Sequence, residues 1–296
     1  MSDIPVPGQP VILFAEQCAP GALSEQNQDS VLHVRIALGD LLVVAGGIGE
    51  DTGGATASRM VVEYFYAHLA SLPSDYPPDH ALREAAALAN EKIQAAVGEP
   101  GSPHLRMGST VVAALLQQGA DGPFAWVGHI GHSRAYLLRA GRLHRLTTDH
   151  SAVQTLLSRN LITPQEALDH PEAFVSTRFL GQSPEVEIDI EQHALAVDDT
   201  LLLCSSGLWG HIPVQKIQKT MAAPGLTLET AAHNLLGLAL ATRSREDIGI
   251  EMLRLVPPRT PDPPQKEKPF PGLKWILAVF LLALAGLFVL AYLTFF

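Results

Sequence analysis

Residues 41–58 read LLVVAGGIGEDTGGATAS, a stretch that holds one strand, one loop and the start of one helix. Its beginning, LLVVAG, is a short apolar run that ends in glycine, which is typical of a strand. From Ala55 to Leu72 apolar residues recur at spacings of three and four, which predicts an amphipathic helix. The stretch therefore predicts a strand that runs into a glycine-rich, acidic loop, followed by a helix.

The segments on either side repeat these two patterns. Short apolar runs predict further strands at 11–15, 30–38, 109–118, 123–130, 134–139, 142–146, 186–190, 200–204 and 248–255. Helical spacing predicts further helices at 80–97, 152–158, 164–167 and 228–242. Ala140-Gly141 is short enough to join two of the strands as a tight hairpin. Strands in runs and helices in pairs predict an α+β fold of two stacked antiparallel β-sheets flanked by helices.

Composition excludes several classes of protein. Of 296 residues, 20 are Lys or Arg and 30 are Asp or Glu, which gives a net charge of −10. This acidic balance argues against nucleic acid as a partner, because binding to phosphate needs Lys and Arg. Cys18 and Cys204 are too few for a disulfide scaffold, and we expect two buried, reduced thiols.

The end of the sequence predicts a membrane anchor. Residues 275–296 (WILAVFLLALAGLFVLAYLTFF) carry no charge, and at a rise of about 1.5 Å per residue they would form a helix of roughly 33 Å. The preceding residues 257–274 contain seven prolines and four basic side chains, which predicts an extended basic linker. We therefore expect a domain at 1–256, the linker, and a single transmembrane helix.

The orientation of this anchor follows from the positions of the basic residues. All four linker cations, Arg259, Lys266, Lys268 and Lys274, precede the apolar segment, so the positive-inside rule places the domain at 1–256 in the cytoplasm. The N-terminal residues do not resemble a signal peptide, because they contain no Lys or Arg and only a short apolar run. The sequence thus predicts a tail-anchored membrane protein with a cytoplasmic N-terminal domain.

Seven segments, in order over about 230 residues, resemble the metal-dependent protein phosphatase family (PPM type, protein phosphatase 2C-like). They are 25–30 (EQNQDS), 41–58, 107–116 (MGSTVVAALL), 127–151, 161–168 (LITPQEAL), 199–212 (DTLLLCSSGLWGHI) and 245–253 (REDIGIEML). The resemblance implies a sandwich of two antiparallel sheets with helices outside. It also implies hydrolysis of phosphoserine and phosphothreonine by two Mg²⁺ or Mn²⁺ ions at one edge of that sandwich.

Several family positions carry a different residue here. The aspartate that bridges both metal ions in the family falls on Gly46, and two further family aspartates fall on His132 and Ser206. The family arginine that binds the substrate phosphate falls on Ser24. Because two divalent ions need anionic oxygen ligands and a bridging group to hold the attacking hydroxide, these changes predict a catalytically degenerate site.

A few ligands remain at the matching positions. The resemblance assigns Asp29, the carbonyl of Gly47, and Glu246 with Asp247 to a vestigial metal site. Glu50 and Asp51 lie in the same loop as the lost bridge and are an alternative source of carboxylates, although a solvated acidic loop is the simpler interpretation.

Three other features have competing interpretations. His129 and His132 flank Gly131 and suggest zinc, but no third ligand accompanies them at a suitable spacing. Asp149 is expected to cap the helix that begins at Ala152. Arg134 is expected to form an internal ion pair rather than to contact phosphate.

These residues leave two functions open. The first is a membrane-tethered pseudophosphatase that needs no cofactor and binds a protein partner, a phosphoprotein or a kinase, without turnover. The second is an active serine/threonine phosphatase with a rearranged Mg²⁺ or Mn²⁺ site that uses Asp29, Glu246, Asp247 and one of the loop carboxylates. An unrelated α+β domain would require the seven segments to match by coincidence.

Overall fold

Strand β3 (Gly39–Gly49) explains why residues 41–45 are continuously apolar. Leu41 and Val43 pack on one face of the strand with the first helices, while Leu42 and Val44 pack on the other face between the two sheets. A strand that is buried on both faces has no polar alternation, so its sequence is an unbroken apolar run. The structure, a computed structural model, describes residues 10–49, 52–98, 107–163, 166–167, 170–258 and 271–295.

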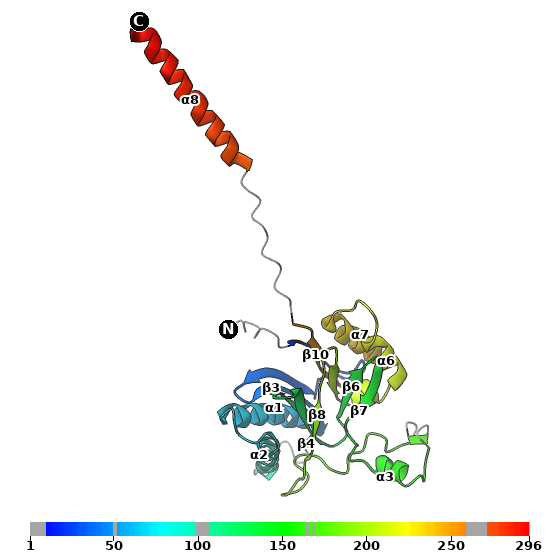
Figure 1. Cartoon of the computed structure of the whole chain (residues 1–296). Coiled ribbons are helices and arrows are strands. Elements are labelled where there is room, and N and C mark those ends of the chain that lie inside the picture. Colours follow the sequence, from blue (N-terminus) through cyan, green and yellow to red (C-terminus); the bar gives the residue numbers. More distant parts are fainter. Residues whose placement is uncertain are drawn as a thin grey trace. The chain divides into compact units, whose positions relative to one another are not determined.

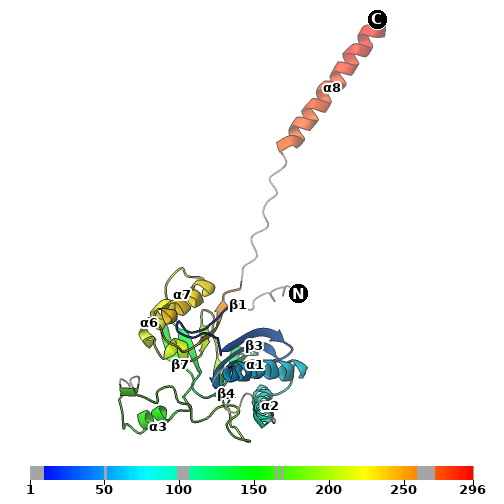
Figure 2. The ribbon, with the colours of Figure 1, turned by 180° about the vertical axis from the view of Figure 1, so that it is seen from behind.

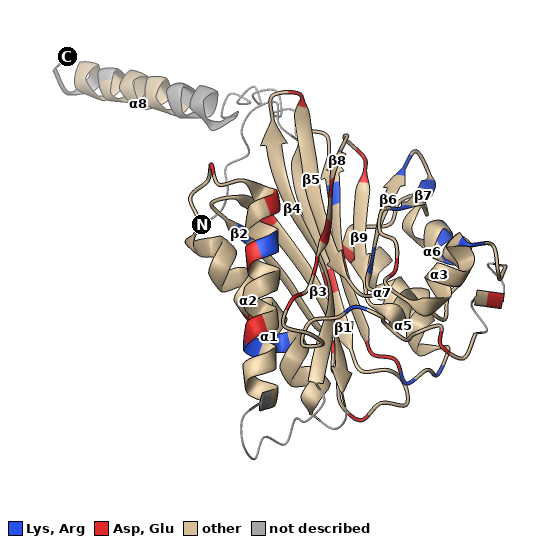
Figure 3. Cartoon of the chain, turned by 90° about the horizontal axis from the view of Figure 1, so that it is seen from below, with Lys and Arg blue, Asp and Glu red and all other residues tan. Residues whose placement is uncertain are grey.

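The first sheet has the strand order β2-β3-β4-β5-β8, and the second has the order β1-β10-β9-β6-β7. Every paired strand runs antiparallel to its neighbours. The remaining strand bounds are β1 Val11–Ala19, β2 Ser30–Ile36, β4 Met107–Gly119, β5 Gly122–Ile130, β6 Arg134–Arg139, β7 Arg142–Arg145, β8 Asp189–Ala194, β9 Thr200–Cys204 and β10 Ile248–Val256. The two sheets stack face to face (Figures 1 and 3).

Helices cover the outer face of each sheet, as the views from both sides show (Figures 1 and 2). Helices α1 (Gly53–Ser71) and α2 (Pro78–Gly98) pack on the first sheet, with Val61, Phe65 and Leu82 fully buried against it. Helices α5 (Ser206–Trp209), α6 (Val214–Met221) and α7 (Leu228–Leu240) pack on the second sheet. A third apolar core fills the space between the sheets, so the predicted two-sheet α+β architecture is confirmed.

Most of the predicted elements are present, with small shifts of their ends. The Ala140-Gly141 hairpin is confirmed, and both residues have positive φ, 49° and 76°, as a two-residue turn between twisted strands requires. Helix α3 (Ala152–Ser158) has the predicted bounds, whereas β8 begins three residues later than expected, and residues 164 and 165 lie outside the described part. Helices α5 and α6 are not predicted because they span only four and eight residues, too few to establish a period.

The two cysteines differ in their surroundings. Cys204 is buried, and burial raises the pKa of its thiol to about 12. Cys18 is exposed, so the expectation of two buried thiols is wrong for this residue. It lies on β1, an edge strand of its sheet, and its Sγ accepts a hydrogen bond from Asn27 Nδ2 at 3.1 Å.

Residues 259–296 form a second unit, separate from the unit at 1–258. This unit contains α8 (Pro271–Phe295), whose described side chains, at 279–287 and 289–292, are exposed. No helix in the described part of the chain meets the length and hydropathy that a membrane span requires. The expected linker falls mainly on residues 259–270, which lie outside the described residues, as do some side chains of the expected span.

One carboxylic acid lies inside the sandwich. Glu251 on β10 is 0% exposed, and neither of its side-chain oxygens has a hydrogen-bond partner among the described residues. Its neighbour across the strand pair is Glu16 on β1. Burial, reinforced by the charge of Glu16, raises the pKa of Glu251 to about 9, so the buried group is neutral at pH 7.

This buried acid predicts that stability falls as the pH rises. The folded state holds a proton on Glu251 that the unfolded chain releases above its ordinary pKa of about 4.5, so stability is lost between about pH 4.5 and 9. Between pH 4.5 and pH 7 the loss is about 3 kcal/mol, at roughly 1.36 kcal/mol per pH unit. Glu251→Gln should flatten this part of the curve, measured by urea unfolding at several pH values. Glu63→Gln on the exposed face of α1 is the control, and an unchanged slope in Glu251→Gln would contradict the assignment.

Candidate functional site

The fold brings the predicted metal ligands to one end of the sandwich. Asp29 immediately precedes β2, whose first residue pairs with Ala45 of β3, so Asp29 lies beside Gly46. Ser206 begins α5, and Asp247 directly precedes β10. Strands from both sheets end here, which is why residues more than 200 positions apart meet.

Asp29 is the carboxylate of this group whose environment alters its pKa most clearly. Its Oδ2 has no hydrogen-bond partner among the described residues and lies 3.4 Å from the point where a β-carbon on Gly249 would stand. Burial is the main cause that raises the pKa of Asp29 to about 7. The Ser205 hydroxyl opposes this shift by stabilising the carboxylate, whereas the charges of Asp247 and Glu246 add to it.

The two acidic residues before β10 already have partners within the protein. Asp247 Oδ1 accepts a hydrogen bond from the backbone N–H of Gly21 at 2.9 Å, and its Oδ2 accepts one from the N–H of Gln28 at 2.7 Å. Glu246 Oε2 accepts a hydrogen bond from Ser206 Oγ at 3.0 Å. Asp247 therefore fastens the segment between β1 and β2 to the start of β10.

Hydroxyl groups and the carboxylate of Asp29 lie around Gly46, the position to which the family resemblance assigns a bridging carboxylate. Ser109 Oγ and Thr110 Oγ1 donate hydrogen bonds to its carbonyl oxygen at 3.1 and 3.3 Å. Thr110 Oγ1 also lies 2.8 Å from Ser133 Oγ. A β-carbon on Gly46 would come within 2.8 Å of Thr110 Oγ1, so a side chain here requires the threonine to move.

These residues are a poor fit for two divalent cations. Mg²⁺ and Mn²⁺ need several unengaged anionic oxygens in a near-octahedral arrangement, but both oxygens of Asp247 accept backbone N–H groups. Within the described residues, Asp29, Glu246 and Asp247 do not form a group whose ligand atoms are close enough to share a metal ion. Glu50 and Asp51 lie outside the described residues, so their contribution stays a prediction.

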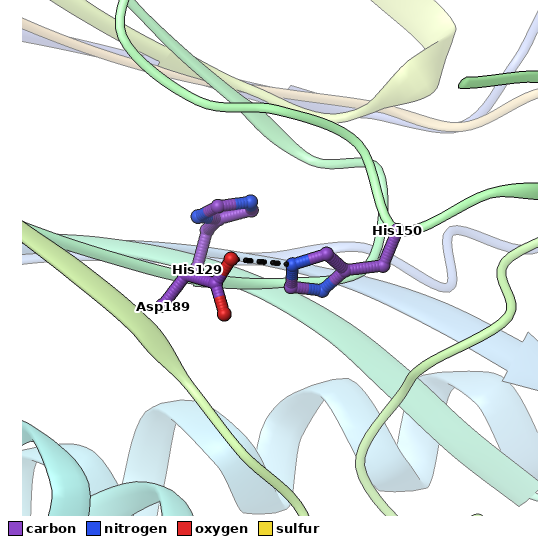
Figure 4. A group of neighbouring side chains, drawn as sticks. All are labelled: His129, His150 and Asp189. Carbon is purple, nitrogen blue, oxygen red and sulfur yellow. Dashed lines mark hydrogen bonds and ion pairs between the residues drawn. The ribbon is translucent and has the colours of Figure 1, made fainter. Parts of the chain in front are cut away.

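A different cluster does bring three side chains of metal-ligand type together. His129, His150 and Asp189 have ligand atoms that all lie within 4.8 Å of one another (Figure 4). The sequence suggests His129 as a zinc candidate together with His132, but the structure groups it with residues from other elements instead. No local pattern signals this cluster, because its members are far apart in the chain.

The hydrogen bonds of this cluster indicate a structural role rather than a metal site. His150 Nδ1 accepts a hydrogen bond from the N–H of Gly131 at 3.1 Å, so the proton of the neutral ring is on Nε2, which faces Asp189 Oδ2 at 3.1 Å. In this tautomer both ring nitrogens of His150 are engaged within the protein. Arg178 also places a cation 2.7 Å from Asp189 Oδ1, and burial lowers the pKa of both histidines, which keeps them neutral.

Arg134 lies next to this cluster and forms the predicted internal ion pair. Its Nε and Nη2 donate to Asp149 at 3.0 and 2.6 Å, its Nη1 donates to Tyr136 Oη at 3.1 Å, and its guanidinium lies 3.2 Å from the ring centroid of Trp209. Arg145 donates to the same carboxylate. The expectation that Asp149 caps α3 is wrong, because Ser151 is the N-cap and its side chain accepts the N–H of Gln154.

Two further positions that the sequence predicts to be degenerate are His132 and Ser24. His132 is buried, its ring meets Trp209 edge-on at 6.0 Å between centroids, and its carbonyl accepts the Trp209 indole N–H at 3.0 Å. Its ring is not part of the acidic cluster or of the His129 group. Ser24 lies at the surface, where its Oγ donates a hydrogen bond to the carbonyl of Gln26 at 2.8 Å. A serine at this position does not supply the guanidinium that the family resemblance implies for binding phosphate.

Loss of the shared carboxylate should destabilise the domain. Asp149→Asn leaves the largely buried guanidinium of Arg134 and the more exposed one of Arg145 without a counter-charge, and we expect a loss of about 3–5 kcal/mol in the free energy of unfolding. Asp198→Asn, at an exposed position, is the control and should cost less than about 0.5 kcal/mol. Urea unfolding at pH 7 compares the two, and equal losses would show that Asp149 does not neutralise the arginines.

The comparisons with known proteins agree with this fold. The sequence profile of the Protein phosphatase 2C family matches residues 23–228. The chain is 33% identical over 248 residues to the serine/threonine protein phosphatase PstP of Mycobacterium tuberculosis, an alignment that covers 83% of this chain but only 45% of PstP. It is 32% identical to protein phosphatase PhpP of Streptococcus pneumoniae, over 77% of this chain and 96% of PhpP.

A solved structure extends the similarity to three dimensions. The catalytic domain of PstP in complex with two manganese ions superposes with a TM-score of 0.73 at 29% identity, and the match covers 84% of this chain and all of that domain. An unrelated α+β domain is therefore excluded. The sandwich of two antiparallel sheets flanked by helices is the PPM-type fold, and this chain belongs to the protein phosphatase 2C family.

Proposed function

We propose that this chain is a pseudophosphatase, a phosphatase-family domain that binds a protein partner without hydrolysing phosphate esters. The observation that carries the proposal is Gly46, which offers no carboxylate where the family resemblance implies a bridging aspartate, and which lies among the hydroxyl groups of Thr110 and Ser133 and the carboxylate of Asp29. Removal of a bridging anion leaves two divalent ions to repel each other and removes the group that positions the hydroxide.

The remaining side chains support the same proposal. Asp247 is engaged with backbone N–H groups and Glu246 with a serine hydroxyl, so both serve to hold the loops at this edge. His132 and Ser206 replace two more implied carboxylates. Taken together, these residues maintain the fold at this edge of the sandwich, but they do not supply the carboxylate ligands that two cations need.

The negative charge of the acidic edge indicates which class of protein partner it can bind. Asp29, Glu246 and Asp247 are acidic, and Ser24 stands where the resemblance implies a phosphate-binding arginine. A phosphate dianion is repelled by such a surface unless a cation intervenes. Of the two partner classes expected, the charge therefore favours a kinase surface over a phosphorylated residue docked at this edge.

The relatives favour a second candidate function. PstP and PhpP are named as phosphatases, and the PstP catalytic domain binds two manganese ions in its structure. By analogy with these relatives, this chain would be an active serine/threonine phosphatase with a rearranged metal site. That candidate needs additional carboxylates, for which Glu50 and Asp51 are available in the sequence.

Metal titration and phosphate release separate the two candidates. For a pseudophosphatase we expect no calorimetric heat of Mn²⁺ binding up to about 1 mM above a buffer blank, and no phosphate release from phosphothreonine peptides or p-nitrophenyl phosphate, since ~10²¹-fold catalysis depends on the metal pair. PhpP, treated identically, is the positive control. Turnover that Asp29→Asn and Glu246→Gln abolish would establish the active enzyme instead.

We also propose that the domain is tethered to a membrane from the cytoplasmic side by residues 275–296. The support is the sequence, which has no charge over this segment and four basic residues before it. The described side chains of α8 are exposed and mostly apolar, among them Leu284 and Leu287.

The tether is testable in the full chain. Leu284→Lys with Leu287→Lys places two charges in the centre of the segment, each of which costs about 3 kcal/mol in a bilayer. We expect the wild type to stay in the membrane pellet after carbonate extraction and the double variant to be released, while Leu284→Ile with Leu287→Ile stays in the pellet. A wild-type chain found in the supernatant would contradict the tether.

A further inference from the structure

A cavity of about 740 Å³ lies on the outer side of the second sheet. The strands β6 and β7 form one wall, and residues of α3, α5 and α6 with the segment before them form the others. Strands β6 and β7 each begin and end with an arginine, and basic positions are visible along them in Figure 3. Its apolar lining includes Val153, Leu157, Phe174, Trp209, Ile212 and Val214.

The cavity has an excess of positive charge. Arg134 and Arg145 both line it, and their side chains are only 16% and 28% exposed. Asp149 is the one acidic side chain among the described residues that line the cavity, and it is shared by both guanidinium groups. The partly exposed cations of Arg134 and Arg145 against one carboxylate leave a net charge of about +1 in a cavity whose lining is both apolar and polar.

The two arginines differ in how many of their N–H donors already have an acceptor. Arg134 uses its donors on Asp149 and Tyr136 and its flat face on Trp209. For Arg145, the described residues accept a hydrogen bond only from Nη2, so its Nε and Nη1 have no acceptor among them. Burial and the nearby Arg134 lower the pKa of Arg145, as expected for a cation whose charge is incompletely balanced.

No other lining group among the described residues offsets this charge. His211 lines the cavity and its Nε2 lies 2.8 Å from Ser244 Oγ, while Ser151 Oγ accepts the N–H of Gln154. His132, whose carbonyl binds the Trp209 indole, has a pKa lowered by burial and is neutral. The cavity therefore suits an anion that brings one negative charge and an apolar body.

We propose that this cavity binds a small organic monocarboxylate, whose carboxylate is held by the guanidinium of Arg145 and whose apolar body packs on Trp209, Phe174 and Ile212. The forked donors of arginine match the two oxygens of a carboxylate. A phosphate monoester carries about −1.5 to −2 charges at pH 7, which exceeds the single positive charge available. This site is distinct from the acidic edge and does not depend on whether the domain hydrolyses phosphate.

The ligand would contact elements that also shape the acidic edge. Trp209 ends α5, the short helix whose first residue, Ser206, holds Glu246. The indole N–H of Trp209 also holds the carbonyl of His132 at 3.0 Å. An occupant of the cavity therefore packs against the same short helix that fixes one side of that edge.

Calorimetry with 4-phenylbutyrate tests the proposal on the full chain in detergent at pH 7. We expect saturable binding by the wild type, and binding at least 10-fold weaker for the uncharged 4-phenylbutanamide, because the amide lacks the charge-assisted pair with Arg145. Arg145→Gln should weaken 4-phenylbutyrate binding at least 10-fold. Arg142→Gln, on the same strand but exposed and outside the cavity lining, should stay within twofold of the wild type.

Three outcomes would overturn the proposal. They are equal binding of the acid and its amide to the wild type, unchanged binding in a folded Arg145→Gln variant, and binding of phenyl phosphate at least 10-fold tighter than 4-phenylbutyrate. The comparison of acid and amide uses only the wild-type chain, so it decides the matter even if Arg145→Gln does not fold. Thermal melting of each variant shows which of them fold.

Discussion

The carboxylate of Asp149 is shared by the guanidinium groups of Arg134 and Arg145, and much of the second sheet's outer face depends on it. Through Arg134 it fixes the hydroxyl of Tyr136 and the face of the Trp209 ring. Trp209 in turn holds the carbonyl of His132. Because a buried charge without a partner is costly, this chain of contacts constrains β6, β7 and α5 to one arrangement.

At the acidic end of the sandwich, the same kind of side chain has a different task. Asp247 and Glu246 hold loops together through backbone N–H groups and a serine hydroxyl, so their charges are satisfied by the protein itself. Asp29 has one oxygen without a partner among the described residues and is the least compensated of the three. We propose that these hydrogen bonds take the place of metal binding at this edge, and that turnover is lost as a result.

The fold can be predicted well from the sequence, and the site only partly. Strands such as β3 are recognisable because burial on both faces demands an unbroken apolar run, and the Ala140-Gly141 turn is recognisable because few residues accept positive φ. The meeting of Asp29 with Glu246 and Asp247 follows from family resemblance rather than from local pattern. No local spacing in the sequence predicts that Arg134 and Arg145 share Asp149. The same holds for the contact of His150 with Asp189. Both contacts depend on side-chain positions across separate strands and loops.

The pairing of β1 with β10 has a consequence for how the chain folds during synthesis. β10 lies between β1 and β9, and the hydrogen bond from Gly21 to Asp247 joins residues 226 positions apart. The first strand therefore has no neighbour in its own sheet until almost the whole domain has been translated. During that interval its exposed edge and apolar face need protection from other nascent chains, so folding of this domain should be slow and sensitive to the supply of chaperones.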